Sequence, residues 1–157
     1  MPVIVIVALV GYVVIIFSRA STHFYSKTVD NGGLKGGVST TSKNSGGGKA
    51  RVVGSTPVET SYTAAEMQQA KRVCASVYLG GSSQGKLTVS SNSPVVAYTT
   101  SSQSVNFGTG YKQNAYNDIC QEIDSVFVAI AGSYGAKVAV SQSSGDVKVR
   151  EIWIEQN

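Results

Sequence analysis

The chain has 157 residues, of which 42% are hydrophobic, 8% aromatic and only 14% charged, and its formal net charge is +4. This length is enough for one domain of ordinary size. A single histidine and two cysteines exclude an all-Cys/His zinc site, which needs four such ligands, and any two-histidine metal motif. We therefore expect neither a metal nor a cofactor.

Residues 1–18 predict a transmembrane anchor. The first 17 residues carry no charged side chain, and ten of them are Val or Ile. A helix of this length, rising about 1.5 Å per residue, covers most of a hydrocarbon core of roughly 30 Å. A buried β-strand and a signal peptide without a basic n-region are the alternatives. The expected lipid contacts are Val3, Ile4, Val5, Ile6, Val7, Val10, Val13, Val14, Ile15, Ile16 and Phe17.

Residues 19–60 predict a flexible linker, because they are rich in Gly, Ser and Thr and poor in large apolar side chains. The segment holds six basic residues against Asp30 and Glu59, whereas basic and acidic residues cancel from residue 61 onward. A solvated spacer is one interpretation. The other is weak contact with an anionic surface, either lipid headgroups or nucleic acid, through Arg19, Lys27, Lys35, Lys43, Lys49 and Arg51.

Residues 61–157 predict a small α+β domain of order α-β-β-α-β-β, with both helices packed on one face of an antiparallel sheet. Thr63 and Glu66 form a capping-box pattern, from which a helix is expected to run to about Leu79. A second, amphipathic helix is expected from near Asn114 to just before Gly132.

Short strands separate and follow these two helices in the prediction. Around residues 143–146 we expect a hairpin turn, and a bulge near Arg150 and Glu151 would keep the apolar side chains of the last strand on one face. The expected strands cover residues 86–90, 94–100, 104–107, 136–141 and 147–155.

Cys74 and Cys120 fall on the inward faces of the two predicted helices, so a disulfide closing a loop of about 46 residues is expected. Two buried thiols are the alternative. Basic residues after the apolar segment place the domain on the cytoplasmic side, where thiols stay reduced. A virion membrane or a dedicated export system reconciles the two expectations.

Residues able to perform catalysis are sparse. His23 is the only imidazole and lies beside the predicted membrane exit, while Asp118, Glu122 and Asp124 read as a solvated helix face. The glycines at residues 46–48 and 108–110 do not fit a phosphate-binding loop. We expect no catalytic residue and no enzyme.

The overall plan resembles that of type IV pilins in its apolar N-terminus and disulfide-bearing α+β head. The acidic residue that those pilins place near the start of the mature chain is absent, and the Gly-rich stretch after Thr28 cannot continue their long helix. No functional residue is transferred from that family.

The organisation as a whole predicts a single-pass structural or assembly protein that links a bilayer to a protein layer. Its expected location is a virion membrane or a bacterial inner membrane, as part of a virion or a bacterial envelope complex. The expected partners are the bilayer and other structural proteins, within an oligomer or a larger complex. A pilin-like filament subunit and a membrane-tethered cell-wall or glycan-binding module are the alternatives.

Overall fold

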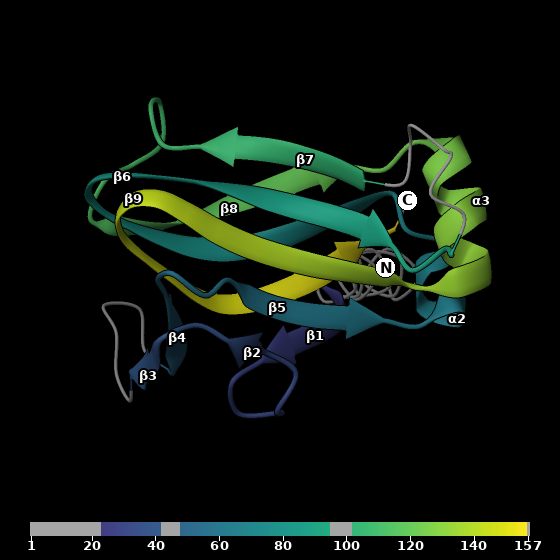
Figure 1. The fold of residues 1–157 in the computed structure, drawn as a ribbon, viewed down its shortest axis with the longest axis horizontal. Coiled ribbons are helices and arrows are strands. Elements are labelled where there is room, and N and C mark those ends of the chain that lie inside the picture. Colours follow the sequence, from purple (N-terminus) through teal and green to yellow (C-terminus); the bar gives the residue numbers. More distant parts are fainter. Residues whose placement is uncertain (1–22, 42–47, 95–101, 157) are drawn as a thin grey trace, which may run out of the picture.

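The computed structural model describes residues 23–41, 48–94 and 102–156. Strands dominate this part of the chain, and two short helices lie at one end of it (Figure 1). The elements are β1 (Phe24–Thr28), β2 (Lys35–Gly36), β3 (Ser39–Thr41), β4 (Ala50–Val53), β5 (Val58–Tyr62), α2 (Ala64–Met67), β6 (Arg72–Ser91), β7 (Ser102–Phe107), β8 (Ala115–Glu122), α3 (Ser125–Tyr134) and β9 (Ala136–Glu155).

The two longest strands, β6 and β9, form an antiparallel ribbon that pairs from Arg72 opposite Glu155 to Ser91 opposite Ala136. Its register is interrupted between Gly80 and Gln84, where both strands bend (left-hand side of Figure 1). The bend divides a continuous antiparallel sheet into two layers. We call them the first sheet, with β8, β1 and β4 beside the ribbon, and the second sheet, with β7 and β5.

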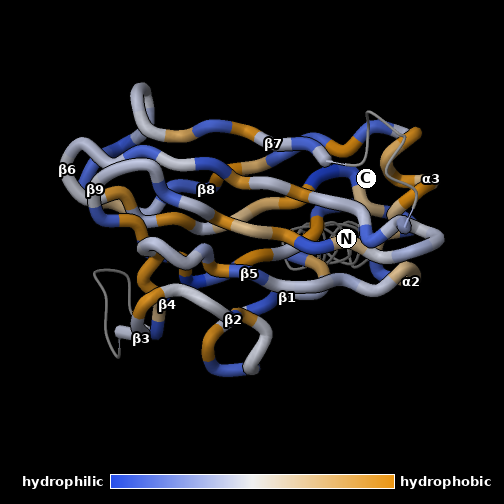
Figure 2. The backbone as a smooth tube through the Cα atoms, in the orientation of Figure 1, coloured by the Kyte–Doolittle hydropathy of each residue, from blue (hydrophilic) through white to orange (hydrophobic). Residues whose placement is uncertain are grey.

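Hydrophobic side chains at every second position explain why these segments form strands. In the first half of β6, Val73, Ala75, Val77 and Leu79 are fully buried and belong to one core cluster. Polar or smaller side chains alternate with them, so hydrophobic and hydrophilic segments alternate along the strands in Figure 2. Side chains at positions i and i+2 lie on one face of a strand, and this face packs into the core.

The apolar face of β9 changes from odd to even positions along the strand, as the predicted bulge requires. Val149 pairs with Val77, whereas Glu151 pairs with the preceding residue of β6, Ser76. Arg150 is therefore the extra residue, and Ile152 and Ile154 return to the core. The bulge is confirmed, but the predicted hairpin turn at residues 143–146 is wrong, since these residues lie within the bent strand β9.

The predicted α+β class is wrong. Thr63 and Glu66 form the expected capping box, but the helix ends at Met67, and residues 72–79 belong to β6. Asn114–Gly132 is likewise not one helix: it contains β8, and α3 begins only after the N-cap Asp124. In both regions the side chains are compatible with either period, and ladder pairing on both sides of β6 favours the strand.

The predicted linker also needs correction. Within residues 19–60, β1, β4 and β5 all pair with β9, and Leu34 and Val58 are buried in the core. The predicted anchor at residues 1–18, Arg19, Lys43 and most of the strand predicted at 94–100 lie outside the described residues. Of the helices that the structure does describe, none has the length and apolar character needed to traverse a bilayer.

Candidate functional site

Three adjoining hollows form a groove at the end of the molecule where β6 and β9 bend. The largest, of about 340 Å³, shares Gln84, Gly108 and Thr109 with one neighbouring hollow and Gly85, Asn106 and Ser143 with the other. We call this surface the bend groove. It is built from the bends of the long ribbon, the end of β7 and the segment that leads from β7 to β8.

Neutral hydrogen-bonding side chains line most of the bend groove. The carboxamides come from Gln84, Asn106, Gln113 and Gln142, and the hydroxyls from Ser82, Ser83, Thr109, Ser141 and Ser143. Lys86 is the one charged residue among those that line the three hollows within the described part of the chain. Phe107, which is only 4% exposed, contributes the apolar part of the lining.

The groove can form because residue 85 is a glycine, which has no side chain. A Cβ atom placed there would lie 2.2 Å from the carbonyl oxygen of Ser141 and 2.6 Å from Cζ of Phe107. Both distances are far below van der Waals contact. The backbone of β6 can therefore approach the Phe107 ring and the neighbouring strand β9 only with glycine at this position.

The bends that carry the groove are tied together by Ser83, which is 1% exposed. Its hydroxyl accepts the backbone N–H of Asp146 at 2.8 Å and lies 2.9 Å from the Asp146 carbonyl oxygen, with the Gly80 carbonyl as a further acceptor. These contacts join residues that are 63 positions apart in sequence. They join the bend of β6 to the bend of β9 beneath the groove.

Several polar groups of the groove are not used by the protein itself. Among the described residues, the side chains of Gln84 and Asn106 make no hydrogen bond, and the carboxamide oxygen of Gln142 is buried without a donor. Gln84 and Asn106 are exposed, so the donors and acceptors of their carboxamides are accessible from the groove. Gln113, by contrast, donates to the carbonyl oxygens of Gly108 and Tyr111 at 3.4 and 3.5 Å.

A second cluster, on the outer face of the first sheet, is less open. Tyr78 and Tyr116 lie side by side, with Lys148 Nζ 4.8 Å from the centre of the Tyr78 ring and the Arg150 guanidinium 4.1 Å from that of Tyr116. Burial raises the pKa of Tyr116 to about 12, against the opposing effect of Arg150. One face of each ring is therefore in contact with a cation.

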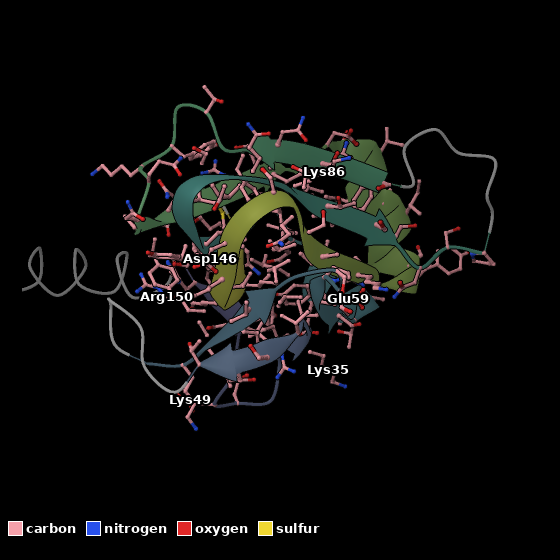
Figure 3. All side chains as sticks on the ribbon, turned by 60° about the vertical axis from the view of Figure 1, so that its left-hand side comes forward. Lys35, Lys49, Glu59, Lys86, Asp146 and Arg150 are labelled. Atoms are coloured by element: carbon pink, nitrogen blue, oxygen red, sulfur yellow. A yellow bond between two sulfur atoms is a disulfide. The ribbon has the colours of Figure 1, made fainter. Side chains whose placement is uncertain are left out.

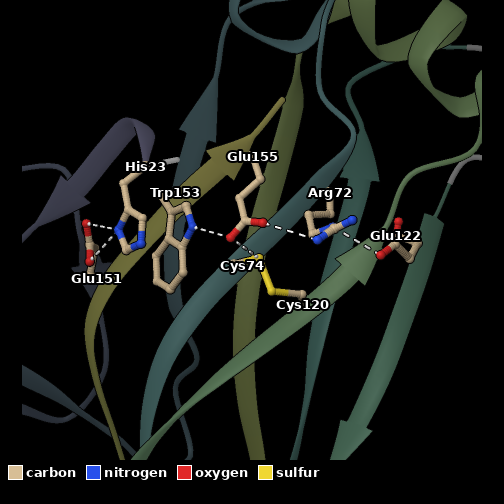
Figure 4. The surroundings of a disulfide bond; sticks show 8 residues. All are labelled: His23, Arg72, Cys74, Cys120, Glu122, Glu151, Trp153 and Glu155. Atoms are coloured by element: carbon tan, nitrogen blue, oxygen red, sulfur yellow. Dashed lines mark hydrogen bonds and ion pairs between the residues drawn. A yellow bond between two sulfur atoms is a disulfide. The ribbon is translucent and has the colours of Figure 1, made fainter. Parts of the chain in front are cut away.

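Cys74 and Cys120 are joined by a disulfide and face each other directly across β6 and β8 (Figure 4). The predicted pairing is present, although both residues lie on strands and not on helices. Glu155 lies beside the disulfide and pairs with Arg72 at 3.3 Å. The two sulfur atoms and a carboxylate oxygen of Glu155 lie within 4.8 Å of one another. Metal binding by cysteine requires a thiolate, and disulfide sulfurs are not thiolates, so we assign no metal to this group.

His23 lies near the disulfide and makes contacts that hold two strands together. Its ring stacks on the buried Trp153 with centroids 4.0 Å apart, and its Nδ1 lies 3.2 Å from the Glu151 carboxylate (Figure 4). Ser26 donates a second hydrogen bond to Glu151 at 2.6 Å. These contacts attach the start of β1 to the end of β9.

The basic residues predicted to contact an anionic surface are dispersed, and four of the six lie in the described part. Lys27 pairs with Glu66 at 3.8 Å, Lys49 pairs with Asp30 at 3.6 Å, and Arg51 donates to the Gly36 carbonyl at 2.6 Å. Lys35 is exposed and shares a hollow with Lys27. Contact with an anionic surface stays a prediction.

The bend groove was not among the predicted sites. Its residues come from three polar segments, near positions 82–86, 106–113 and 141–143, and the last of these adjoins the predicted hairpin turn. Their enrichment in Gln, Asn, Ser and Gly was a visible signal. What the sequence did not show is that the bends of β6 and β9 bring them together.

No protein-family model and no curated protein sequence matches this chain. Solved structures with a similar fold include two family 6 carbohydrate-binding modules. One, studied for its binding subsites by crystallography and calorimetry, is 13% identical with a TM-score of 0.54, and the match covers 86% of this chain and 95% of the module. The other, from Clostridium stercorarium in complex with cellobiose, is 15% identical with a TM-score of 0.50, covering 85% and 95%.

A family two carbohydrate esterase from Cellvibrio japonicus is also similar, at 9% identity and a TM-score of 0.50, but the match spans only 33% of the esterase. At these identities the likeness concerns the fold. It overturns the primary prediction of a structural protein linking a bilayer to a protein layer, together with the virion-membrane or inner-membrane location. It agrees with the predicted alternative, a glycan-binding module, and the chain shares the fold of carbohydrate-binding modules.

Proposed function

We propose that this protein binds saccharides in the bend groove. The observation that carries the proposal is the lining of the groove, which holds four carboxamides and four hydroxyls besides that of Ser83. A carboxamide offers both a donor and an acceptor, and a hydroxyl offers both on one atom. This combination suits a ligand whose surface consists mainly of hydroxyl groups.

The rigidity of the groove supports binding. Ser83 fixes the relative position of the two bends, so little conformational entropy is lost when a ligand orders the site. Because Phe107 is almost fully covered, recognition depends on hydrogen bonds more than on stacking. We expect modest affinity, with Kd between about 1 μM and 1 mM.

The same lining favours binding without catalysis. Hydrolysis of a glycosidic bond generally requires two carboxyl groups, and ester hydrolysis requires an activated nucleophile with a base. Neither a carboxylate nor a histidine lines the three hollows in the described part of the chain. We therefore propose a binding module rather than an enzyme.

Isothermal titration calorimetry with a panel of oligosaccharides tests the proposal. One of the similar modules was solved with cellobiose, so glucose oligomers are the first choice. Asn106→Ala should weaken binding about threefold to tenfold, the loss expected for one or two hydrogen bonds. Asn92→Ala is the matched control, since Asn92 is an exposed amide that does not line the groove.

Gln142→Ala is a second variant in the groove. If Asn106→Ala and Gln142→Ala both bind as tightly as wild type, or if the control loses all affinity, the saccharide binds elsewhere. If the wild-type protein binds none of the oligosaccharides, the proposal is wrong. Circular dichroism of each variant separates a loss of contact from a loss of fold.

A further inference from the structure

We infer that the bend groove takes an acidic saccharide, and that Lys86 binds its carboxylate together with Asn106 and Ser141. The inference rests on the proposed saccharide binding and adds the chemical class of the ligand. It starts from the charge of the groove. Lys86 is the single charged residue that lines the three hollows in the described ranges, so their charge is not balanced by an acidic neighbour in the lining.

The sheet register places the three side chains in one row. Lys86 of β6 is directly opposite Asn106 of β7 on one side and Ser141 of β9 on the other. Residues directly opposite each other project from the same face of a sheet. All three line one hollow of about 280 Å³, which Gly85, Gln142 and Ser143 complete.

This row matches the chemistry of a carboxylate. An ammonium group, an amide N–H and a hydroxyl can donate to its two oxygens, which together accept about four hydrogen bonds. A hydrogen bond between charged partners is about twice as strong as one between neutral groups. A neutral saccharide would use the amide and the hydroxyl but gain little from the ammonium group.

Lys86 is also available for such a ligand. No carboxylate lies within ion-pair distance of it in the described part of the chain. Glu59, which projects from the second sheet at β5, pairs with Lys137 at 3.0 Å. Figure 3 shows Lys86 well separated from Glu59, Lys35 and Lys49.

Paired ligands test the inference. Trimers of galacturonate, glucuronate and mannuronate are each compared with the same trimer carrying methyl-esterified carboxyl groups, and with neutral glucose oligomers. For at least one pair, calorimetry should show about tenfold tighter binding of the acid than of the ester. Added salt should weaken the binding of the acid and leave that of the ester unchanged.

Lys86→Gln should remove this preference, and Lys86→Arg should retain most of it. Lys71→Gln makes the same change of charge at an exposed lysine that does not line the groove, and should behave as wild type. Equal affinity for acids and esters, or a preference that survives in Lys86→Gln, would overturn the inference while neutral saccharide binding stands. If neither acids, esters nor glucose oligomers bind, the proposed function itself fails.

Discussion

The hydroxyl of Ser83 accepts the backbone N–H of Asp146 at 2.8 Å and so joins the bend of β6 to the bend of β9. The two residues are 63 positions apart, and Ser83 is 1% exposed. Buried polar groups of this kind are costly to leave unpaired. The contact therefore contributes both to the stability of the fold and to the shape of the bend groove.

Ser83→Ala should lower the free energy of unfolding by about 1 to 3 kcal/mol, because the Asp146 N–H then has no side-chain acceptor in the interior. Urea denaturation followed by circular dichroism measures this difference. Ser82→Ala removes an exposed hydroxyl one residue away and should change stability by less than about 0.5 kcal/mol. Equal effects of the two substitutions would contradict the role given to Ser83.

Two glycine-to-alanine substitutions should differ in their effect on stability. Gly85→Ala forces a Cβ atom to within 2.2 Å of the Ser141 carbonyl oxygen, and should destabilise the protein by about 2 kcal/mol or more. Gly132 lies inside α3, where the nearest atom would be Cγ of the flexible Gln68 at 3.3 Å. Gly132→Ala should be neutral or stabilising by up to about 1 kcal/mol. The melting temperature of Gly85→Ala should therefore lie below that of the wild-type protein. The melting temperature of Gly132→Ala should equal or exceed it.

Local signals in the sequence were reliable where they depended on neighbouring residues. The capping box of Thr63 and Glu66 and the bulge at Arg150 both follow from side chains within a few positions, and both are present. The extent of the helices could not be predicted in the same way. Residues 72–79 and 115–122 extend as strands because each finds a pairing partner far away in sequence.

The segment at residues 24–60 shows the same limit. Its Gly- and Ser-rich composition lacks the apolar content of an independent core, but the strands within it complete the sheet by pairing with β9. The bend groove depends on still longer connections, since Gln84, Asn106 and Gln142 come from three strands or their ends. Composition identified these stretches as polar, and only the fold brings them together.

The disulfide offers a redox test of stability. Cys74 and Cys120 close a loop with a sequence separation of 46 residues, for which the loop-entropy relation gives about 4 kcal/mol as an upper value. The double substitution Cys74→Ala and Cys120→Ala should lower the free energy of unfolding by about 2 to 4 kcal/mol. A reductant should destabilise the wild-type protein and leave the double variant unchanged. Alkylation of both cysteines in the folded, non-reduced protein would show that the bond is absent.

Alkaline pH should weaken the fold through Tyr116. Its pKa is raised by burial to about 12, above the ordinary value of 10.0 that a tyrosine has in the unfolded chain. Below pH 10 the Tyr116 hydroxyl is neutral in both states, and the free energy of unfolding is unaffected. Between pH 10 and 12 this hydroxyl ionises first in the unfolded chain, so the free energy of unfolding falls. Burial also raises the pKa of Tyr62, which acts in the same direction.

Urea midpoints measured at a series of pH values test this expectation. Tyr116→Phe should reduce the loss of stability between pH 10 and 12, with Tyr134→Phe, at an exposed position, as the matched control. If the two variants lose stability equally steeply across this range, Tyr116 does not contribute to the alkaline transition.

Saccharide binding in the bend groove can be located residue by residue with an NMR titration of the backbone amides. With a saccharide from the panel, the largest shift changes should map to Gln84, Asn106, Thr109 and Gln142, which come from β6, β7, the segment between β7 and β8, and β9. The amides around Tyr78 and Tyr116 should change little. Changes confined to that tyrosine cluster, or no changes with any saccharide of the panel, would contradict the account.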